Sequence, residues 1–367
     1  MKLLLVEPSF PIPPKSRNHS QFLPIGLLKI GTYHEIKGDK VRLVRGLARC
    51  GFTPDRVLIT SLFTYWSKYV HSAARFYHEE YPTAKIEIGG IYASLMPKDC
   101  KKRSPFATVS KGLYRRGAAE RLAPDYSLLP GGLDYQIVHA SRGCPRRCVF
   151  CGSWRIEPVF TAKETVLPEI KKAALVFYDN NLLANPHIDK ILKELAHFRL
   201  RDGRRVSSES QSGFDLGLLT AERAIVLKEA RFRNPRIAWD GPYSEWPRVS
   251  KAVRILRNAG YGGKEIFVFM IYNFKLPYGE MKRKLEACRR WRVRVIDCRY
   301  RPLDLKDEIY RPGAKSQKPG EYYIHPKWTD GQVRRFRRSV RRQNIAVLLD
   351  LPNGRYIRGC EHKFVKT

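Results

Sequence analysis

Three closely spaced cysteines constrain this chain more than any other feature. Residues 140–152 read Ala-Ser-Arg-Gly-Cys-Pro-Arg-Arg-Cys-Val-Phe-Cys-Gly, which places Cys144, Cys148 and Cys151 in the spacing C-x3-C-x2-C. Thiolates are soft ligands that select iron–sulfur clusters, zinc or copper(I). A [4Fe–4S] cluster normally takes four thiolates, so three of them leave one iron open to bind a substrate. The spacing therefore predicts a loop that wraps a cluster, with glycines letting the backbone come close.

Zinc is the alternative for this motif. Zinc sites favour paired C-x2-C motifs or a Cys/His pair at short spacing, and nothing in this chain supplies a second pair. The other cysteines, Cys50, Cys100, Cys288, Cys298 and Cys360, are scattered. A second cluster built from Cys288, Cys298 and Cys360 lacks metal-ligand spacing. We therefore expect one cluster, held by the three cysteines of the motif.

The motif resembles the signature of the radical SAM superfamily, with Phe150 as the aromatic residue just before the last cysteine. The resemblance implies that S-adenosylmethionine chelates the open iron through its amino and carboxylate groups. It also implies an electron donor of the flavodoxin or ferredoxin type. One-electron reduction then cleaves S-adenosylmethionine to methionine and a 5′-deoxyadenosyl radical, which abstracts hydrogen from a substrate that the sequence does not name.

The amino-acid composition limits which partners and which cellular location we expect. The 367 residues, 43% hydrophobic, are enough for two domains. Lys plus Arg number 69 against 35 Asp plus Glu, a net charge of +34. This charge favours an anionic partner, with RNA, DNA or a phosphorylated molecule first and an acidic membrane surface second; a solubilising or heat-adapted surface is the alternative. The N-terminal apolar run is too short for a signal peptide, no stretch is long enough for a membrane span, and we expect a cytoplasmic protein.

Residues 1–125 alternate strand and helix signals, which predicts a doubly wound, Rossmann-like parallel sheet. Strands are expected at 2–6, 41–44, 56–60 and 85–88, and helices at 25–36 and 69–80. Through Leu23–Leu28 and Ile88–Ala93 the order resembles the cobalamin-binding-type domain that precedes the barrel in one radical SAM subfamily. The lower-ligand histidine of the usual D-x-H-x2-G motif is absent from residues 39–46. We expect a degenerate domain without cobalamin; a cobalamin-dependent radical SAM methyltransferase is the alternative.

Residues 126–305 repeat a βα rhythm, which predicts a partial (β/α)6 TIM-type barrel of the radical SAM kind. The expected strands are 135–141, 174–178, 205–210, 236–240, 265–272 and 293–300. The expected helices are 163–173, 187–199, 220–230, 248–259 and 279–291. Chemistry in such barrels sits at the carboxyl ends of the strands, and the cysteine motif follows the first strand.

Polar residues follow the next two strands of the predicted barrel. By resemblance, Asp179 and Asn180 hold the amino group of S-adenosylmethionine, because carboxylate and amide oxygens accept hydrogen bonds from an ammonium. A helix N-cap or Asx turn is the alternative for them. By the same resemblance, Glu209 and Gln211 contact the ribose or the methionine carboxylate; a solvated loop is their alternative. No general acid or other catalytic side chain is identified.

The basic C-terminal extension, residues 306–367, contains one predicted helix within 330–344. Val333, Phe336 and Val340 form its apolar stripe. Around the stripe stand six arginines, at positions 334, 335, 337, 338, 341 and 342. This pattern fits either a helix docked on the barrel with solvated arginines or a phosphate-binding ridge. A nucleic-acid-binding iron–sulfur or zinc protein without catalysis therefore stands as the alternative from another functional class.

Overall fold

The structure is a computed structural model that describes residues 1–11, 23–131, 133–311, 317–318 and 320–351. Contacts divide the chain into two compact units. Unit 1 comprises Met1–Leu133, Cys144–Val159 and Arg301–Tyr323, and unit 2 comprises Asp134–Gly143, Phe160–Tyr300 and the chain from Ile324 on. The segment that carries the cysteine motif thus leaves unit 2 after Gly143 and returns to it at Phe160.

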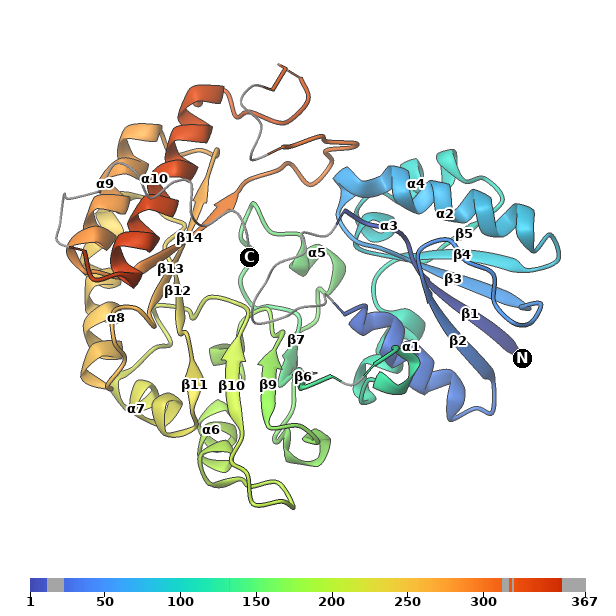
Figure 1. The fold of residues 1–367 in the computed structure, drawn as a ribbon, viewed down its shortest axis with the longest axis horizontal. Coiled ribbons are helices and arrows are strands. Elements are labelled where there is room, and N and C mark those ends of the chain that lie inside the picture. Colours follow the sequence, from blue (N-terminus) through green and yellow to red (C-terminus); the bar gives the residue numbers. More distant parts are fainter. Residues whose placement is uncertain (12–22, 132, 312–316, 319, 352–367) are drawn as a thin grey trace. The chain divides into compact units, whose positions relative to one another are not determined.

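Unit 1 is built on a five-stranded parallel sheet in the order β2-β1-β3-β4-β5 (Figure 1). Its strands are β1 Lys2–Glu7, β2 Lys40–Arg45, β3 Arg56–Ser61, β4 Lys85–Gly90 and β5 Thr108–Val109. Its helices are α1 Ile25–Glu35, α2 Ser67–Glu80, α3 Ile91–Leu95, α4 Pro97–Arg103 and α5 Ser153–Ile156. Alternate strand residues pack on opposite faces, Leu4 against the α2 side and Leu5 against the α1 side. The predicted doubly wound sheet is confirmed.

A close approach of two backbones fixes the carboxyl edge of this sheet. Gly90, the last residue of β4, has a φ of +93°, and a Cβ added there would lie 2.3 Å from the carbonyl oxygen of Ser61 in β3. The Ser61 hydroxyl donates to the Gly89 carbonyl at 2.6 Å and accepts from the Ala93 N–H at 3.0 Å. Only glycine fits this position, because any side chain would meet both strain and backbone.

Unit 2 is the predicted partial barrel, which is confirmed. Its main strands are β6 Tyr135–Val138, β9 Ala174–Phe177, β10 Ser207–Ser210, β12 Arg236–Ala238, β13 Phe267–Tyr272 and β14 Arg294–Arg299. With the short β11 Phe232–Arg233 they form two parallel sheets, β11-β10-β9-β6 and β12-β13-β14, which an isolated parallel bridge between Phe214 and Ile237 connects. The helices outside the sheets are α6 Ile188–His197, α7 Ala221–Glu229, α8 Trp246–Asn258, α9 Tyr278–Arg290 and α10 Asp330–Leu348.

Side-chain amides cover both edges of this open barrel. At one edge, Gln136 of β6 accepts from the N–H groups of Lys171 and Lys172 and donates to the Glu169 carbonyl. At the other edge, Asn344 of α10 accepts from the Val295 N–H and donates to the Val295 carbonyl, both at 2.8 Å. Because an edge strand otherwise leaves backbone groups unpaired, these contacts replace the missing neighbour strands.

One expected helix is wrong. Residues 163–173 form no α-helix: β8 Thr161–Ala162 precedes them, and a single 3-10 turn covers Leu167–Glu169. Pro168 lacks the N–H that a continuing helix needs. The backbone N–H groups of Lys171 and Lys172 are used by Gln136 instead of by a helix. The segment is therefore an irregular cover over the edge strand β6.

A membrane span was not expected, and none of the helices in the described ranges has both the length and the apolar character that crossing a bilayer requires.

Replacing Gly90 with alanine tests the close approach at the edge of unit 1. Alanine would have to adopt a backbone conformation with positive φ, and its Cβ would clash with the Ser61 carbonyl. We therefore expect a loss of about 2–4 kcal/mol in the free energy of unfolding. Gly26→Ala in α1 is the control, because nothing lies within 4 Å of its added Cβ, and helix propensity favours alanine by up to about 1 kcal/mol. Equal urea midpoints for the two variants would contradict the assignment.

Candidate functional site

The cysteine motif lies in a loop whose backbone folds back on the thiols. Gly143, which precedes the first cysteine, has a φ of +75°. The Cys151 N–H donates to the Cys148 carbonyl at 3.0 Å, and the same carbonyl accepts from the indole N–H of Trp154 in α5 at 3.1 Å. All three thiols are half-buried. Gly152 lies against Leu95 of α3, 3.4 Å from where its Cβ would be. The loop is thus shaped by its own backbone and by packing in unit 1.

Backbone N–H groups point at the sulfurs. The Ser153 N–H donates to Cys151 Sγ at 3.5 Å. Burial raises the pKa of the Cys144 thiol, a backbone hydrogen bond from Arg146 lowers it, and the neighbouring Cys148 and Cys151 raise it again. The effect of Cys148 and Cys151 on the pKa of Cys144 shows that the three thiols lie close to one another. Hydrogen bonds to sulfur are among the features that tune an iron–sulfur cluster.

The donor set fits a cubane cluster. Among the residues that the structure describes, no three His, Cys, Asp or Glu side chains converge on a point where one metal ion would sit. A cubane is held differently, with one thiolate on each iron, so its ligands stand around the cluster. Three thiols on one short loop, with N–H groups directed at sulfur, match that requirement.

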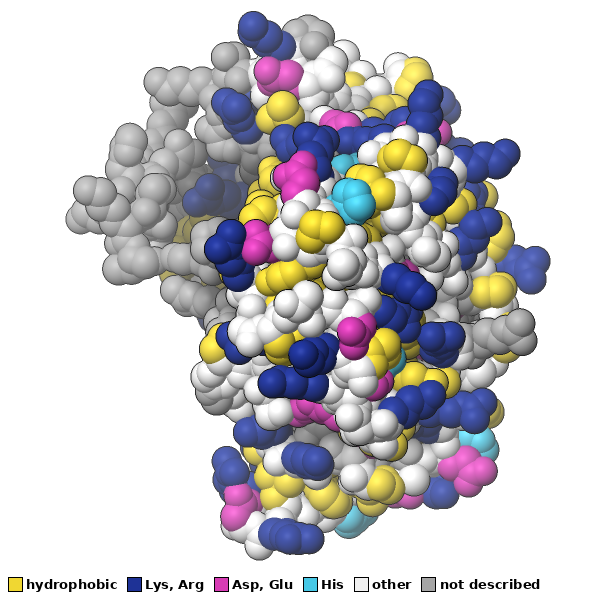
Figure 2. Space-filling view, turned by 90° about the vertical axis from the view of Figure 1, so that its right-hand side faces the viewer, with side chains coloured by type: hydrophobic (Ala, Val, Ile, Leu, Met, Phe, Trp, Pro, Cys, Tyr) yellow, Lys and Arg dark blue, Asp and Glu magenta, His cyan; other side chains and the backbone are white. Residues whose placement is uncertain are grey.

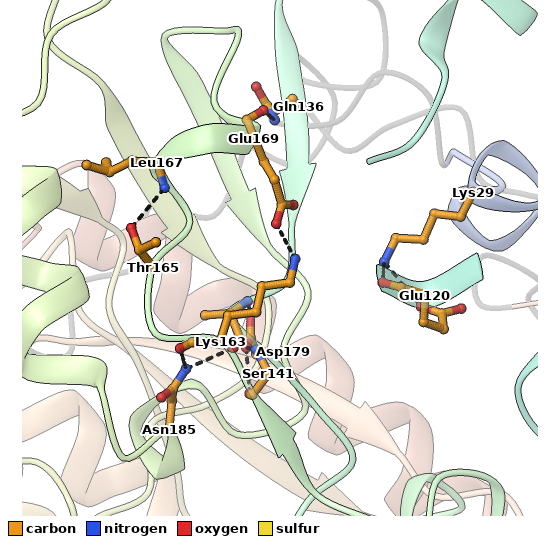
Figure 3. Close-up of polar contacts among 11 residues, drawn as sticks. Lys29, Glu120, Gln136, Ser141, Lys163, Thr165, Leu167, Glu169, Asp179 and Asn185 are labelled. Atoms are coloured by element: carbon orange, nitrogen blue, oxygen red, sulfur yellow. Dashed lines mark hydrogen bonds and ion pairs between the residues drawn. The ribbon is translucent and has the colours of Figure 1, made fainter. Parts of the chain in front are cut away.

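Asp179 holds the point where the cysteine loop begins (Figure 3). It directly follows β9, and its buried carboxylate accepts from the Ser141 N–H at 2.5 Å, the Ser141 hydroxyl at 2.6 Å and the Ala140 N–H at 3.2 Å. A buried carboxylate is costly unless it is hydrogen-bonded in this way. Burial nevertheless raises the pKa of Asp179 to about 6. The expected contact of Asp179 with the amino group of S-adenosylmethionine stays a prediction, and within the protein the carboxylate serves as a backbone anchor.

The two ends of the loop are joined to one another. β7, Ser141–Arg142, pairs antiparallel with β8, Thr161–Ala162. Asn185 then donates from its side chain to the carbonyls of Ala140 at 2.8 Å and Lys163 at 3.1 Å (Figure 3). Asp179 and Asn185 therefore fix both crossing points of the chain, and the loop between them starts from a rigid base.

Glu209 and Arg236 form an ion pair inside the barrel. Both side chains are nearly buried, and Arg236 also donates to the Ser210 carbonyl. Arg236 is in register with Phe267 of β13, and so is Arg294 of β14, whose guanidinium lies 3.8 Å from the Phe267 ring centroid. The opposite face of β13 packs on helices, as Tyr272 does against Phe336 of α10 at 5.0 Å. Glu209 and the two arginines therefore lie on the inner face.

The other expected cofactor contacts remain predictions. Phe150 is half-buried in the loop of unit 1, and Asn180 and Gln211 are half-buried in unit 2. The Gln211 N–H donates to the Phe177 carbonyl at 2.9 Å, so its backbone is tied to β9 while its side chain follows β10. Asp179, Asn180, Glu209 and Gln211 all belong to unit 2, whereas the three cysteines belong to unit 1.

Ser141, Asn185 and Arg236 are the site residues that sequence reasoning missed. Asp179 and Ser141 are 38 residues apart, and Asn185 reaches Ala140 over 45 residues. No local pattern reports such pairings. The sequence contains one indication for Arg236: it is a charged residue at the start of a strand whose two faces are buried, and such a residue needs an oppositely charged or hydrogen-bonding partner.

The described histidines of unit 1 are engaged within the protein. His34 contacts Asp39 and Tyr114 through its two ring nitrogens, and His71 contacts Ser104 and Tyr92. His78 stacks on Phe106 with ring centroids 4.1 Å apart. His19 lies outside the described residues. Among the cysteines of the weighed second cluster, Cys288 is buried, Cys298 is half-buried and Cys360 lies outside the described residues.

The fold and the loop define a class: a Rossmann-like unit combined with a partial barrel that carries a three-cysteine motif after its first strand. No protein-family model matches the sequence, and no curated protein matches it. Among solved structures, the chain is similar to the radical S-adenosylmethionine methyltransferase TsrM from Kitasatospora setae, determined with cobalamin and a [4Fe-4S] cluster bound. The TM-score is 0.63 and the identity 14%, over 83% of this chain and 77% of that one. This likeness confirms the predicted fold, a Rossmann-like domain combined with a partial TIM-type barrel.

The pKa of Asp179 predicts a pH dependence of stability. A carboxyl whose pKa is higher in the folded chain, about 6 against roughly 4 when unfolded, contributes stability that is complete below about pH 4 and is lost as the pH rises through 6. Two pKa units correspond to about 3 kcal/mol. Between pH 7 and pH 4, the free energy of unfolding of the native protein should therefore rise by about that much relative to Asp179→Asn. Urea unfolding of both proteins, without metal, across this range measures it; parallel pH profiles would contradict the burial of an ionisable Asp179.

Proposed function

We propose that this protein is a radical SAM enzyme, in which Cys144, Cys148 and Cys151 hold a [4Fe–4S] cluster. The single observation that carries the proposal is the cysteine loop itself: three neighbouring thiols with N–H groups aimed at sulfur, in a chain with the fold of a radical SAM methyltransferase. When bound, such a cluster supplies the electron that divides S-adenosylmethionine into methionine and a 5′-deoxyadenosyl radical.

The chain's own residues position and shield this chemistry. Asp179 and Asn185 fix the ends of the loop, so the thiols stay where the cluster needs them. Phe150, Asn180 and Gln211 stay the proposed contacts of S-adenosylmethionine. Glu209 is also a proposed contact of S-adenosylmethionine. In addition, its ion pair with Arg236 neutralises the buried guanidinium. A flavodoxin- or ferredoxin-type protein is the proposed electron donor, and the net charge of +34 favours an anionic substrate.

A cobalamin-dependent methyltransferase is the second candidate. The structure of TsrM contains cobalamin, and this chain is similar to that structure over 83% of its length. At the carboxyl edge of the unit 1 sheet, the ring of Phe63 is 43% exposed and stacks on Tyr65 at 5.0 Å. Ligands of doubly wound sheets bind at this edge. Neither His34 nor His71 has a ring nitrogen left for cobalt.

Reductive cleavage of S-adenosylmethionine tests the first candidate. The protein is reconstituted anaerobically with iron and sulfide, given S-adenosylmethionine and a strong reductant, and assayed for 5′-deoxyadenosine. Cys148→Ala should lower the yield at least about 100-fold, because one lost thiolate removes a cluster ligand. Cys50→Ala is the control, since Cys50 lies outside the motif and contacts Phe52 and Tyr81. Product at equal levels from both variants, or zinc in place of iron and sulfide, would favour the non-catalytic nucleic-acid-binding alternative.

Cobalamin binding tests the second candidate. If unit 1 takes up cobalamin, its visible spectrum should match cobalamin without a histidine ligand, and it should be unchanged in His34→Gln and His71→Gln. A spectrum typical of imidazole coordination that either variant removes would contradict this expectation. Absence of binding, together with formation of 5′-deoxyadenosine, would leave the first candidate alone.

A further inference from the structure

The positive charge of unit 2 is concentrated on some of its outer helices. α6 and α7 carry acids and bases that pair with each other, as in Arg223 with Asp189 at 2.8 Å. α8 has no acidic residue at all. α10 has six arginines and one acid, Asp330, which pairs with Arg334 in the first turn. An ordinary soluble surface mixes the two signs, so α8 and α10 depart from the pattern of their own neighbours.

Nine of the exposed cations on α8, α9 and α10 are considered together. We call them the basic face: Arg248, Lys251 and Arg254 of α8; Lys282, Arg289 and Arg290 of α9; Arg335, Arg338 and Arg341 of α10. Within the described part of the chain, no acidic side chain forms an ion pair with any of them. Arginines three or four residues apart on one helix repel each other, so this arrangement lowers helix stability unless an anion lies against it.

The three helices follow one another around the barrel. α10 packs its apolar stripe, Val333, Phe336 and Val340, inward, and it lies beside α9 (Figure 1). α8 and α9 meet where the ring of Trp246 stacks on Trp291, with centroids 6.1 Å apart, and Arg257 donates to the Trp291 carbonyl. The cations are therefore exposed on neighbouring helices of unit 2.

An aromatic side chain is partly exposed at the N-terminal end of α8. Trp246, the first residue of α8, is 37% exposed and lies two positions before Arg248. An exposed ring among cations is the combination with which proteins bind single-stranded nucleic acids, because bases stack on the ring while cations contact the backbone. Arginine predominates on the face, and its planar fork matches phosphate oxygens.

We propose that the basic face binds single-stranded nucleic acid through its phosphates, which deepens the proposed function by naming the class of molecule that the enzyme acts on. A membrane-binding helix would lay its apolar side into the lipid, but the apolar side of α10 is already buried in the barrel. On the face shown in Figure 2, Lys and Arg lie among Asp, Glu and apolar side chains.

Binding of a fluorescent 20-nucleotide single-stranded RNA, and of the same DNA sequence, to the full chain reconstituted with iron and sulfide tests the proposal. The triple variant Arg335→Gln, Arg338→Gln, Arg341→Gln should bind at least about tenfold more weakly at 0.15 M salt. The slope of log K against log salt should fall by about 2, because each lost contact to a single strand contributes about 0.7. Trp246→Ala should weaken binding without changing that slope, since stacking releases no counterions.

A matched control removes the same charge from another part of unit 2. Lys171→Gln, Lys193→Gln, Arg201→Gln changes three exposed cations outside the basic face and should bind as the native protein does. Equal weakening by both triple variants, no binding by the native protein, or binding only to phosphatidylglycerol vesicles would overturn the proposal. The 5′-deoxyadenosine assay on the same samples separates the two claims: cleavage without nucleic-acid binding defeats the basic face alone, and binding without cleavage defeats the proposed enzyme alone.

Discussion

The buried carboxylate of Asp179 is the interaction on which the cysteine loop depends. β7 and β8 are only two residues long each, too short to hold a loop by themselves. Asp179 supplies acceptors for the N–H groups of Ala140 and Ser141, and Asn185 supplies donors for the carbonyls on either side. Both ends of the loop are thereby attached to the strand β9 and the turn after it. The sequence between these two attachment points, which carries the three cysteines, is therefore not needed to hold the loop in place.

The sequence specified the elements well where their signals are local. The alternation of strand and helix signals located the main strands, and the capped, apolar stripe of 330–344 located α10, whose Thr329 and Gln332 form a capping box. The helix expected at 163–173 failed because its backbone N–H groups serve Gln136, a partner about 35 residues away. The same limit applied at Asp179. A carboxylate after a strand reads equally as a ligand, a cap or a backbone anchor, and only the fold brings Ser141 to it.

The interior of the barrel shows why alternation alone could not place Glu209. Both faces of a parallel strand are buried, so hydrophobic pattern does not separate them. The strand register separates the two faces. Arg236 and Arg294 are both in register with Phe267, and the strand residues that point to the opposite face pack on the helices. A charge on the inner face has to find a partner there, and Glu209 meets Arg236. The pair keeps both ionised groups inside without leaving either charge uncompensated.

α10 separates the residues that hold the fold from those available for function. Its apolar stripe packs inward, and Gln343 and Asn344 bond the edge strand β14 through the carbonyls of Val293 and Val295. Arg335, Arg338 and Arg341 take part in neither contact. Their mutual repulsion opposes helix formation, and the packing of the opposite face outweighs it. The helix would be as well packed with neutral side chains at these positions. The demands of folding therefore do not account for the arginines, and this is the reason for the proposal that they bind an anion.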